Sequence, residues 1–352
     1  MFMTGLGTAT PRHRYTQEEC WHAFEAAPQF AELDRRARAT LHGVLLHENG
    51  IRTRSLALDT LSEVFVADPD TLHRRFALHA PALAHDAATR ALQQAGLHPR
   101  EVDAIVISTC TGYLCPGLTS YVGESLGLRP DAFALDLVGQ GCGAALPNLR
   151  TAEALLRAGE CEKVLSICVE VCSAAFYIDN DPGVLISACL FGDGAGAAVL
   201  AATPAATGRS VEWKAAASLH NPDERNALRF EHTKGVLRNV LSPEVPQLAG
   251  EHAAMVVADV LRRNGLARGD INAWIMHAGG RKVIEALQQH LELSAADVAW
   301  SSQVLSEFGN MSSPSVYFTL QAALAGGAPG GWWWMSSFGA GFSCHGALLK
   351  VA

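Results

Sequence analysis

The chain has 352 residues and a mass of 37.4 kDa, enough for one large two-layered unit or two domains with sizeable cores. Its net charge is −8 and its basic residues are scattered, so it lacks the electrostatic footprint of a nucleic-acid-binding protein. No basic-then-apolar leader and no apolar stretch approaching 18 residues is present, so we expect a cytoplasmic protein without a membrane span. Nine cysteines without a C-x-x-C pair favour reduced thiols and indicate no metal site.

Apolar strands alternate with helical patterns in the first half of the chain. An Ala/Leu-rich pattern over residues 81–96 predicts one helix, and a second is predicted from Cys142 through residue 158. Buried strands are predicted over residues 104–109, 132–138 and 163–169. This alternation predicts an α/β sheet covered on both faces, and the less legible residues 12–80 are expected to form a helical surface cap.

The second half of the chain repeats the scheme. Helices are predicted over residues 251–264, 282–291 and 317–324, and strands over 273–277 and around the tryptophan run 332–334. The glycine-rich segments 191–200 and 338–349 resemble each other, and each ends one half of the chain. We therefore expect an internal duplication, with an N-terminal half over 1–205 and a C-terminal half over 206–352.

Cys142 is the strongest candidate for a nucleophile. It lies between Gly141 and Gly143, where an apolar strand turns into a helical pattern, and these glycines keep the thiol uncrowded. A helix N-terminus favours the thiolate form. Two later strand-to-turn segments end in polar residues that could assist it, His277 and Asn310.

These segments resemble the Cys–His–Asn centre of the thiolase superfamily, specifically the type III polyketide synthases (chalcone-synthase-like enzymes). The resemblance is carried in chain order by residues 5–11, 110–117, 191–195, 309–313 and 338–342. It implies a five-layered αβαβα fold with two duplicated halves, the first carrying Cys142 and the second carrying His277 and Asn310. It also implies a homodimer.

The three residue types suit decarboxylative condensation. A thiolate attacks a thioester and is a good leaving group afterwards. His277 could form an ion pair with Cys142 and donate to a developing oxyanion, and the uncharged amide of Asn310 suits a second donor. Together they could stabilise the enolate that a malonyl thioester forms when it loses CO₂.

The resemblance also implies the residues of the acyl cavity. Phe191 and Phe230 occupy the two gatekeeper positions, where aromatic walls would exclude water. Cys110, Cys172 and Ala175 stand where plant enzymes tend to carry threonine, and Ser312 keeps a small residue. A roomier, more apolar cavity follows, which suits an aliphatic acyl chain. Cys115 occupies the interface-loop position whose side chain reaches into the partner's cavity.

Coenzyme A thioesters are expected as substrates, with no resident cofactor. Gly279, Gly280, Arg281 and Lys282 open a helix just after His277, and helix-end N–H groups with two cations can bind phosphate. Gly339 and Gly341 retain the backbone donors of a family loop. Weaker candidates for binding the coenzyme A phosphates lie near the family's N-terminal basic cluster, and a solvated face is the favoured interpretation of these charges: Arg35, Arg36, Arg38, Arg52 and Arg54.

The sequence therefore predicts an iterative type III polyketide synthase, an acyltransferase. An acyl-CoA starter held on Cys142 would be extended with malonyl-CoA and cyclised to an alkylpyrone or alkylresorcinol. One alternative is a single condensation of the ketoacyl-carrier-protein synthase III type. The other is a non-catalytic acyl-CoA-binding paralogue, against which the intact triad argues.

Overall fold

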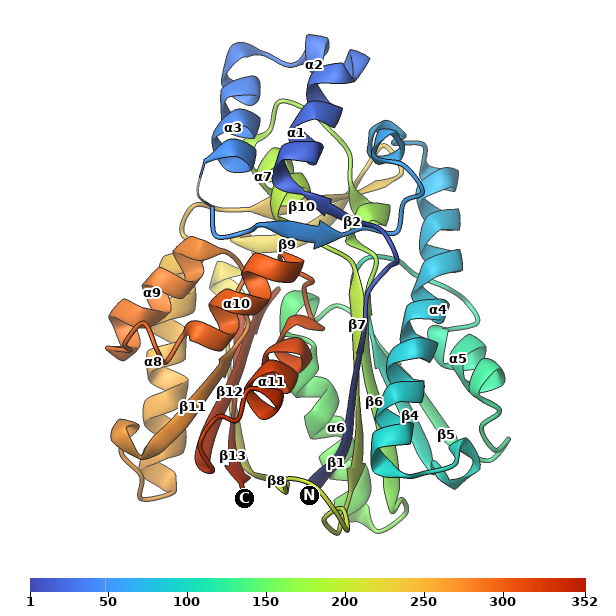
Figure 1. Cartoon of the computed structure of the whole chain (residues 1–352), viewed down its shortest axis with the longest axis vertical. Coiled ribbons are helices and arrows are strands. Elements are labelled where there is room, and N and C mark those ends of the chain that lie inside the picture. Colours follow the sequence, from blue (N-terminus) through green and yellow to red (C-terminus); the bar gives the residue numbers. More distant parts are fainter. Residues whose placement is uncertain (48) are drawn as a thin grey trace.

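A nine-stranded mixed sheet organises the chain in the computed structural model, which describes residues 1–47 and 49–352 (Figure 1). Its strand order is β11-β12-β13-β8-β1-β7-β6-β4-β5. The strands are β1 (Phe2–Ala9), β4 (Ala104–Ser108), β5 (Phe133–Leu137), β6 (Lys163–Glu170), β7 (Gly194–Ala201), β8 (Val211–His220), β11 (Ile271–Met276), β12 (Gly331–Gly339) and β13 (Ser343–Val351). The predicted strands at 104–109, 132–138, 163–169 and 273–277 are confirmed, as is the strand around the tryptophans, of which Trp333 and Trp334 are fully buried.

The two halves of the sheet have the same topology. In the order β4-β6-β7-β1 the successive pairings are parallel, antiparallel and antiparallel. In the order β11-β12-β13-β8 they are again parallel, antiparallel and antiparallel. A short pairing between β1 and β8 joins the halves into one sheet. This repetition confirms the duplicated fold, while the border between residues 205 and 206 stays a prediction within the connection from β7 to β8.

Helices form three layers around the two half-sheets. Helices α6 (Ala145–Ala158) and α11 (Ser315–Ala325) lie between the halves and contact strands of both. Helices α4 (Pro69–Ala95) and α5 (Leu118–Leu126) cover the outer face of the first half. Helices α8 (Val245–Arg263), α9 (Arg281–Leu291) and α10 (Ala299–Phe308) lie on the second half (Figure 1). The layer order is therefore αβαβα, as expected.

A cap covers one end of the half-sheets, opposite both termini (Figure 1). It contains α1 (Gln17–Ala26), α2 (Pro28–Glu32), α3 (Arg35–Leu46), α7 (Pro182–Leu190) and two small sheets, β2 (Arg14–Thr16) with β3 (Thr53–Ser55) and β9 (Leu228–Thr233) with β10 (Val236–Leu241). None of the helices in the described part of the chain is long and apolar enough to cross a bilayer.

Helix α4 begins twelve residues earlier than the sequence pattern predicted, at Pro69 rather than at Pro81. The Asp68 side chain caps its first turn by accepting a hydrogen bond from the N–H of Thr71 at 2.8 Å. Pro81 therefore lies inside the helix, where it costs a backbone hydrogen bond. Burial of an apolar face on both sides of Pro81, against β1 and β7, stabilises the continuous helix.

Candidate active site

Cys142 lies in a single 3-10 turn, Gly141–Gly143, directly before α6. Gly141 has a left-handed backbone with φ of +55°, which explains why a glycine precedes the thiol. The β12–β13 turn packs against this segment so closely that a Cβ on Gly339 would lie 2.2 Å from the carbonyl oxygen of Gln140. Gly339 and Gly341 thus belong to the loop that supports Cys142, and their role as donors to substrate stays a prediction.

His277 and Asn310 converge on Gly279, and each side chain is only 3% exposed. The Asn310 amide donates to the Gly279 carbonyl oxygen at 3.0 Å, and its own oxygen accepts from the N–H of Ser312 at 2.8 Å. The His277 Nε2 atom lies 3.6 Å from the position that a Cβ on Gly279 would occupy. The two side chains therefore share one small region, reached from β11 and from the end of α10.

Ser312 connects this region to Cys142, the candidate nucleophile. Its hydroxyl donates to the Cys142 sulfur at 3.1 Å, and its backbone is held in the left-handed region with φ of +59°. A non-glycine residue rarely adopts that conformation, so the surrounding fold fixes it. Short contacts thus run from Cys142 through Ser312 and Asn310 to Gly279, beside His277. Within the described residues, Cys142 has no hydrogen bond with His277.

Burial sets the protonation of the free site. Burial raises the pKa of Cys142 to about 12, and it lowers the pKa of His277 to about 4. Both groups are therefore neutral at pH 7. The sequence favoured a thiolate because of the helix start, but loss of water around a thiol that is 8% exposed outweighs that effect here.

Glu170 is a buried acid that the sequence analysis missed. Its carboxylate accepts hydrogen bonds from the N–H of Cys110 at 3.0 Å, the hydroxyl of Thr111 at 2.9 Å and the hydroxyl of Ser313 at 2.7 Å. The Cys110 thiol also donates to it at 3.3 Å, which places Cys110 beside the site. Burial raises the pKa of Glu170. The sequence contains one indication of this buried acid, because Glu170 directly follows the apolar run 163–169.

A partly open cavity adjoins Cys142, with about 280 Å³ of empty space that includes its open mouth. Ser312, which bonds to the thiol, is part of its wall, and Cys142 packs with two other wall residues, Cys172 and Phe191. The wall consists of Thr111, Cys172, Ala175, Phe176, Ser187, Phe191, Phe230, Asn239 and Ser312. Five of these residues were predicted from the sequence. Thr111, Phe176, Ser187 and Asn239 were not. Thr111 lies in the segment 110–117, where Cys110 and Cys115 were singled out instead, and the other three residues carry no motif.

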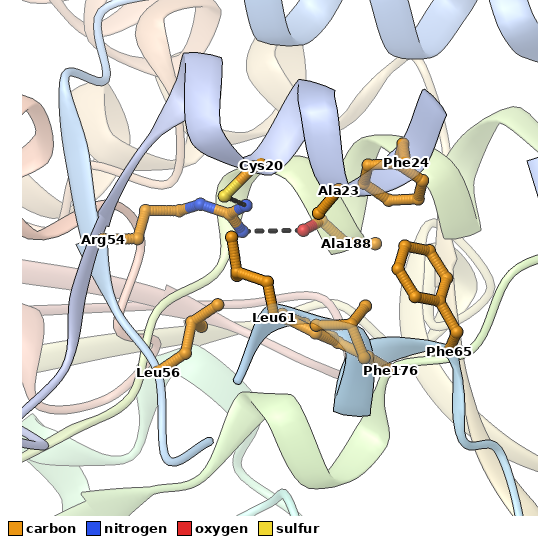
Figure 2. A pocket seen from close by; sticks show the side chains of 10 residues that line it. Cys20, Ala23, Phe24, Arg54, Leu56, Leu61, Phe65, Phe176 and Ala188 are labelled. Carbon is orange, nitrogen blue, oxygen red and sulfur yellow. Dashed lines mark hydrogen bonds between the residues drawn. The ribbon is translucent and has the colours of Figure 1, made fainter. Parts of the chain in front are cut away.

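A second cavity, of about 260 Å³, lies under α1 on the other side of Phe176, which lines both cavities. Figure 2 shows Arg54 reaching into its wall beside Cys20 and Ala188. The Arg54 side chain is 2% exposed and donates to the carbonyl oxygens of Ala188 at 2.6 Å and of Phe191 at 2.8 Å. Arg54 is therefore neither on a solvated face nor available to coenzyme A, because its guanidinium is used inside the fold to hold the segment around Phe191.

The predicted anion site lies at the start of α9. Gly280 is the residue before the first turn, and Arg281 and Lys282 are exposed within it. Arg281 also forms an ion pair with Glu285 at 2.7 Å. This helix start adjoins the site because the preceding Gly279 carries the carbonyl oxygen that Asn310 binds.

Cys115 is exposed and is not part of the cavity wall of its own chain. All nine cysteines are free of disulfide bonds, so the Cys142 thiol is available for chemistry.

Two duplicated halves that meet at a cysteine, a histidine and an asparagine define a thiolase-like condensing enzyme. Residues 25–220 match the family model described as FAE1/Type III polyketide synthase-like protein. Residues 261–351 match the model of the 3-oxoacyl-(acyl-carrier-protein) synthase III C terminal. The chain therefore belongs to the type III polyketide synthase family, whose members are acyltransferases.

Relatives of known name support this assignment over nearly the whole chain. The 3,5-dihydroxyphenylacetyl-CoA synthase of Streptomyces toyocaensis is 31% identical and covers 99% of this chain and 89% of its own length. The alpha-pyrone synthesis polyketide synthase-like Pks18 of Mycobacterium tuberculosis is 32% identical over 90% of this chain and 82% of its own. The crystal structure of PKS-I from the brown alga Ectocarpus siliculosus superposes with a TM-score of 0.90 at 27% identity, covering 99% of this chain and 98% of that one.

Proposed function

We propose that this enzyme loads an acyl-CoA starter on Cys142, extends it repeatedly with malonyl-CoA, and cyclises the product to an alkylpyrone or alkylresorcinol. The observation that carries the proposal is the apolar cavity beside Cys142, whose wall includes both Phe191 and Phe230. The repeated use of malonyl-CoA agrees with the polyketide-forming relatives, one of which makes alpha-pyrones by its name.

Loading of the starter begins with Cys142 and His277 both neutral. As the Cys142 sulfur attacks the thioester carbonyl, its proton passes to the neutral imidazole of His277, and the coenzyme A thiolate leaves and is protonated. The lowered pKa of His277 means that the proton is readily given up again to the departing group.

Extension uses the two polar side chains at Gly279. When malonyl-CoA loses CO₂, the electron pair of the broken bond forms an enolate, whose oxygen accepts from His277 and from the second N–H of Asn310. The first N–H of that amide is bonded to the Gly279 oxygen, which fixes its direction. The enolate carbon attacks the acyl group on Cys142 and the sulfur leaves as thiolate. Loss of one such donor costs about 3 kcal/mol of barrier.

The starter class follows from the cavity wall. On one side of the wall, Cys172, Ala175 and Phe176 offer no strong hydrogen-bond donor, so the alkyl part of an acyl chain fits there better than a polar group. The space beside Cys142 is smaller than an ordinary ligand site, so the extended chain requires the cavity to expand during turnover.

We place a second subunit on the exposed edge strand β5. Phe133 on β5, Val138 directly after it and Tyr113 in the loop between β4 and α5 are 47%, 59% and 69% exposed, which is unusual for large apolar side chains. A homodimer formed through this edge would cover them and would bring Cys115 toward the partner's cavity. Size-exclusion chromatography with light scattering tests this, and a monomer at micromolar concentration refutes it. A cytoplasmic location also stays a prediction.

The direct test is incubation of the purified enzyme with malonyl-CoA and a ladder of acyl-CoA chain lengths, with products identified by mass spectrometry. We expect products of two or more condensations, which Cys142→Ala abolishes and Asn310→Ala reduces at least a hundredfold. Cys161→Ala is the matched control, because Cys161 is as buried as Cys142 but lies in the distant core. Full turnover by either site variant would refute the assigned roles.

The match of the C-terminal residues to a 3-oxoacyl-carrier-protein synthase III model favours one competing activity. In that case malonyl-CoA alone would give no product, and adding malonyl carrier protein to the incubation would give a single condensation. Catalysis by these relatives argues against the non-catalytic acyl-CoA binder.

A further inference from the structure

The hairpin β9–β10 brings one polar side chain to a cavity wall that is otherwise mainly apolar on that side. It forms a separate two-stranded sheet, in which Phe230 and Asn239 are direct cross-strand partners. Both residues line the cavity beside Cys142. Arg238 forms ion pairs with Asp181, the residue before α7, and with Glu231 of β9, so the hairpin is held in place over the cavity.

The Asn239 amide is only partly satisfied by the protein. Its side chain is 8% exposed, and its nitrogen donates to the hydroxyl of Ser187 at 2.8 Å. That hydroxyl in turn donates to the Gly183 carbonyl oxygen at 2.7 Å, which fixes the direction of the chain of bonds. The Asn239 amide oxygen accepts no hydrogen bond from the described residues. A buried amide with an unused acceptor and an unused N–H carries a desolvation cost that a polar ligand atom would offset.

The other polar residues of the wall are already used. The hydroxyl of Thr111 donates to Glu170, and that of Ser312 donates to the Cys142 sulfur. Both belong to the catalytic side of the cavity. Asn239 and its hydrogen-bond partner Ser187 therefore form a second polar region of the cavity wall. The hairpin and α7 provide this region, whereas the loops around Cys142 provide the first.

The chemistry of the proposed intermediates matches a neutral amide. An alkyl starter has no polar atom to offer Asn239. A poly-β-keto chain has an oxygen on every second carbon, as ketone or as enol, and an amide can donate to the first and accept from the second. A buried polar group discriminates strongly against a ligand that cannot pair with it.

We propose that Asn239 is a specificity-determining residue that hydrogen-bonds a keto or enol oxygen of the growing poly-β-ketoacyl chain and so sets the number of extensions. This inference rests on the proposed function and names the intermediate, not the starter, as the ligand of the amide. Chains long enough to reach Asn239 are held for a further condensation. Chains that cannot reach it are released early.

The test compares the product distribution of Asn239→Leu with that of the wild-type enzyme, using one aliphatic acyl-CoA and malonyl-CoA. We expect the ratio of longer to shorter products to fall about tenfold, the effect of one lost hydrogen bond. Acylation of Cys142 by the starter should stay within twofold. Asn239→Ala removes the amide without adding bulk, so it should shift the ratio in the same direction if the leucine variant fails to fold.

Asn264→Leu is the matched control, because Asn264 directly follows α8 and is not part of the cavity wall, so we expect an unchanged product ratio. An unchanged product ratio in folded, active Asn239 variants overturns the inference. So does a parallel loss of acylation and condensation without a change in ratio, or a shift in Asn264→Leu as large as that in Asn239→Leu. If the wild-type enzyme itself forms no polyketide from malonyl-CoA, the proposed function fails instead.

Discussion

Replacing His277 by glutamine should remove a large part of the acid sensitivity of this fold. The imidazole is fully buried, its Nδ1 atom has no hydrogen-bond partner among the described residues, and burial lowers its pKa from 6.5 to about 4. Between these two values the unfolded chain binds a proton that the folded chain refuses. The stability that this group confers is thus complete above pH 6.5 and is lost as the pH falls toward 4.

The size of the effect follows from the two pKa values. A difference of about 2.5 corresponds to about 3 kcal/mol when fully developed near pH 4, and to about 2 kcal/mol at pH 5. His345 is also buried, and burial lowers its pKa to about 4, so the wild-type protein carries a second contribution of the same sign. The buried acids Glu170 and Asp193 have raised pKa values and act in the opposite direction. These contributions cancel when a His277 variant is compared with the wild type.

The assay is urea unfolding at pH 7 and pH 5, followed by tryptophan fluorescence. The free energy of unfolding should fall by about 2 kcal/mol less in His277→Gln than in the wild type over this interval. His73→Gln is the matched control, because His73 is exposed and its side chain is solvated in both states. Equal pH dependence of His277→Gln and wild type would refute the argument that His277 is neutral because it is buried.

Three further substitutions test the supports of the site. Arg54→Met should destabilise the fold by about 3 kcal/mol in urea unfolding, because it leaves two buried carbonyl oxygens unpaired, and a loss below 1 kcal/mol would contradict this role. Gly339→Ala should abolish product formation, because the new Cβ would meet the Gln140 oxygen at 2.2 Å, whereas Gly43→Ala has open space and should stay active. Phe176→Ala removes the wall that the two cavities share, so mass spectrometry should show acceptance of longer acyl-CoA starters; an unchanged chain-length preference would show that the cavities do not join.

The pattern of the sequence predicted β4, β5, β6, β11 and β12 because each is a run of apolar residues, whereas β8 and the two small sheets of the cap were not predicted. Seven of the eight residues of β6 are buried, which leaves little ambiguity about its type or place. The start of α4 was not predicted, because Pro81 has the usual signature of a helix beginning. The helix passes through it only because tertiary contacts along one face offset the lost hydrogen bond.

The residues of the candidate site likewise include some that a local pattern predicts and some that it does not. Cys142, His277 and Asn310 follow from glycine-rich turns after strands, and these are local features. Asn239 and Ser187 carry no such signature, because an asparagine in a short strand and a serine in a helix are ordinary residues. Glu170 could be read only as an acid at the end of an apolar run. Their importance arises from segments that are far apart in the sequence and meet at one cavity.

Periodicity in the amino-acid sequence indicated an α/β sheet and the duplication, and the resemblance of its glycine-rich turns to type III polyketide synthases implied the five-layered fold and the three polar side chains. The tertiary structure decided which side chains share the cavity, that Arg54 is inside the fold, and that the thiol and imidazole are neutral. Those properties depend on how much water is excluded around each group. Water exclusion is set by packing between distant segments, which no local pattern specifies.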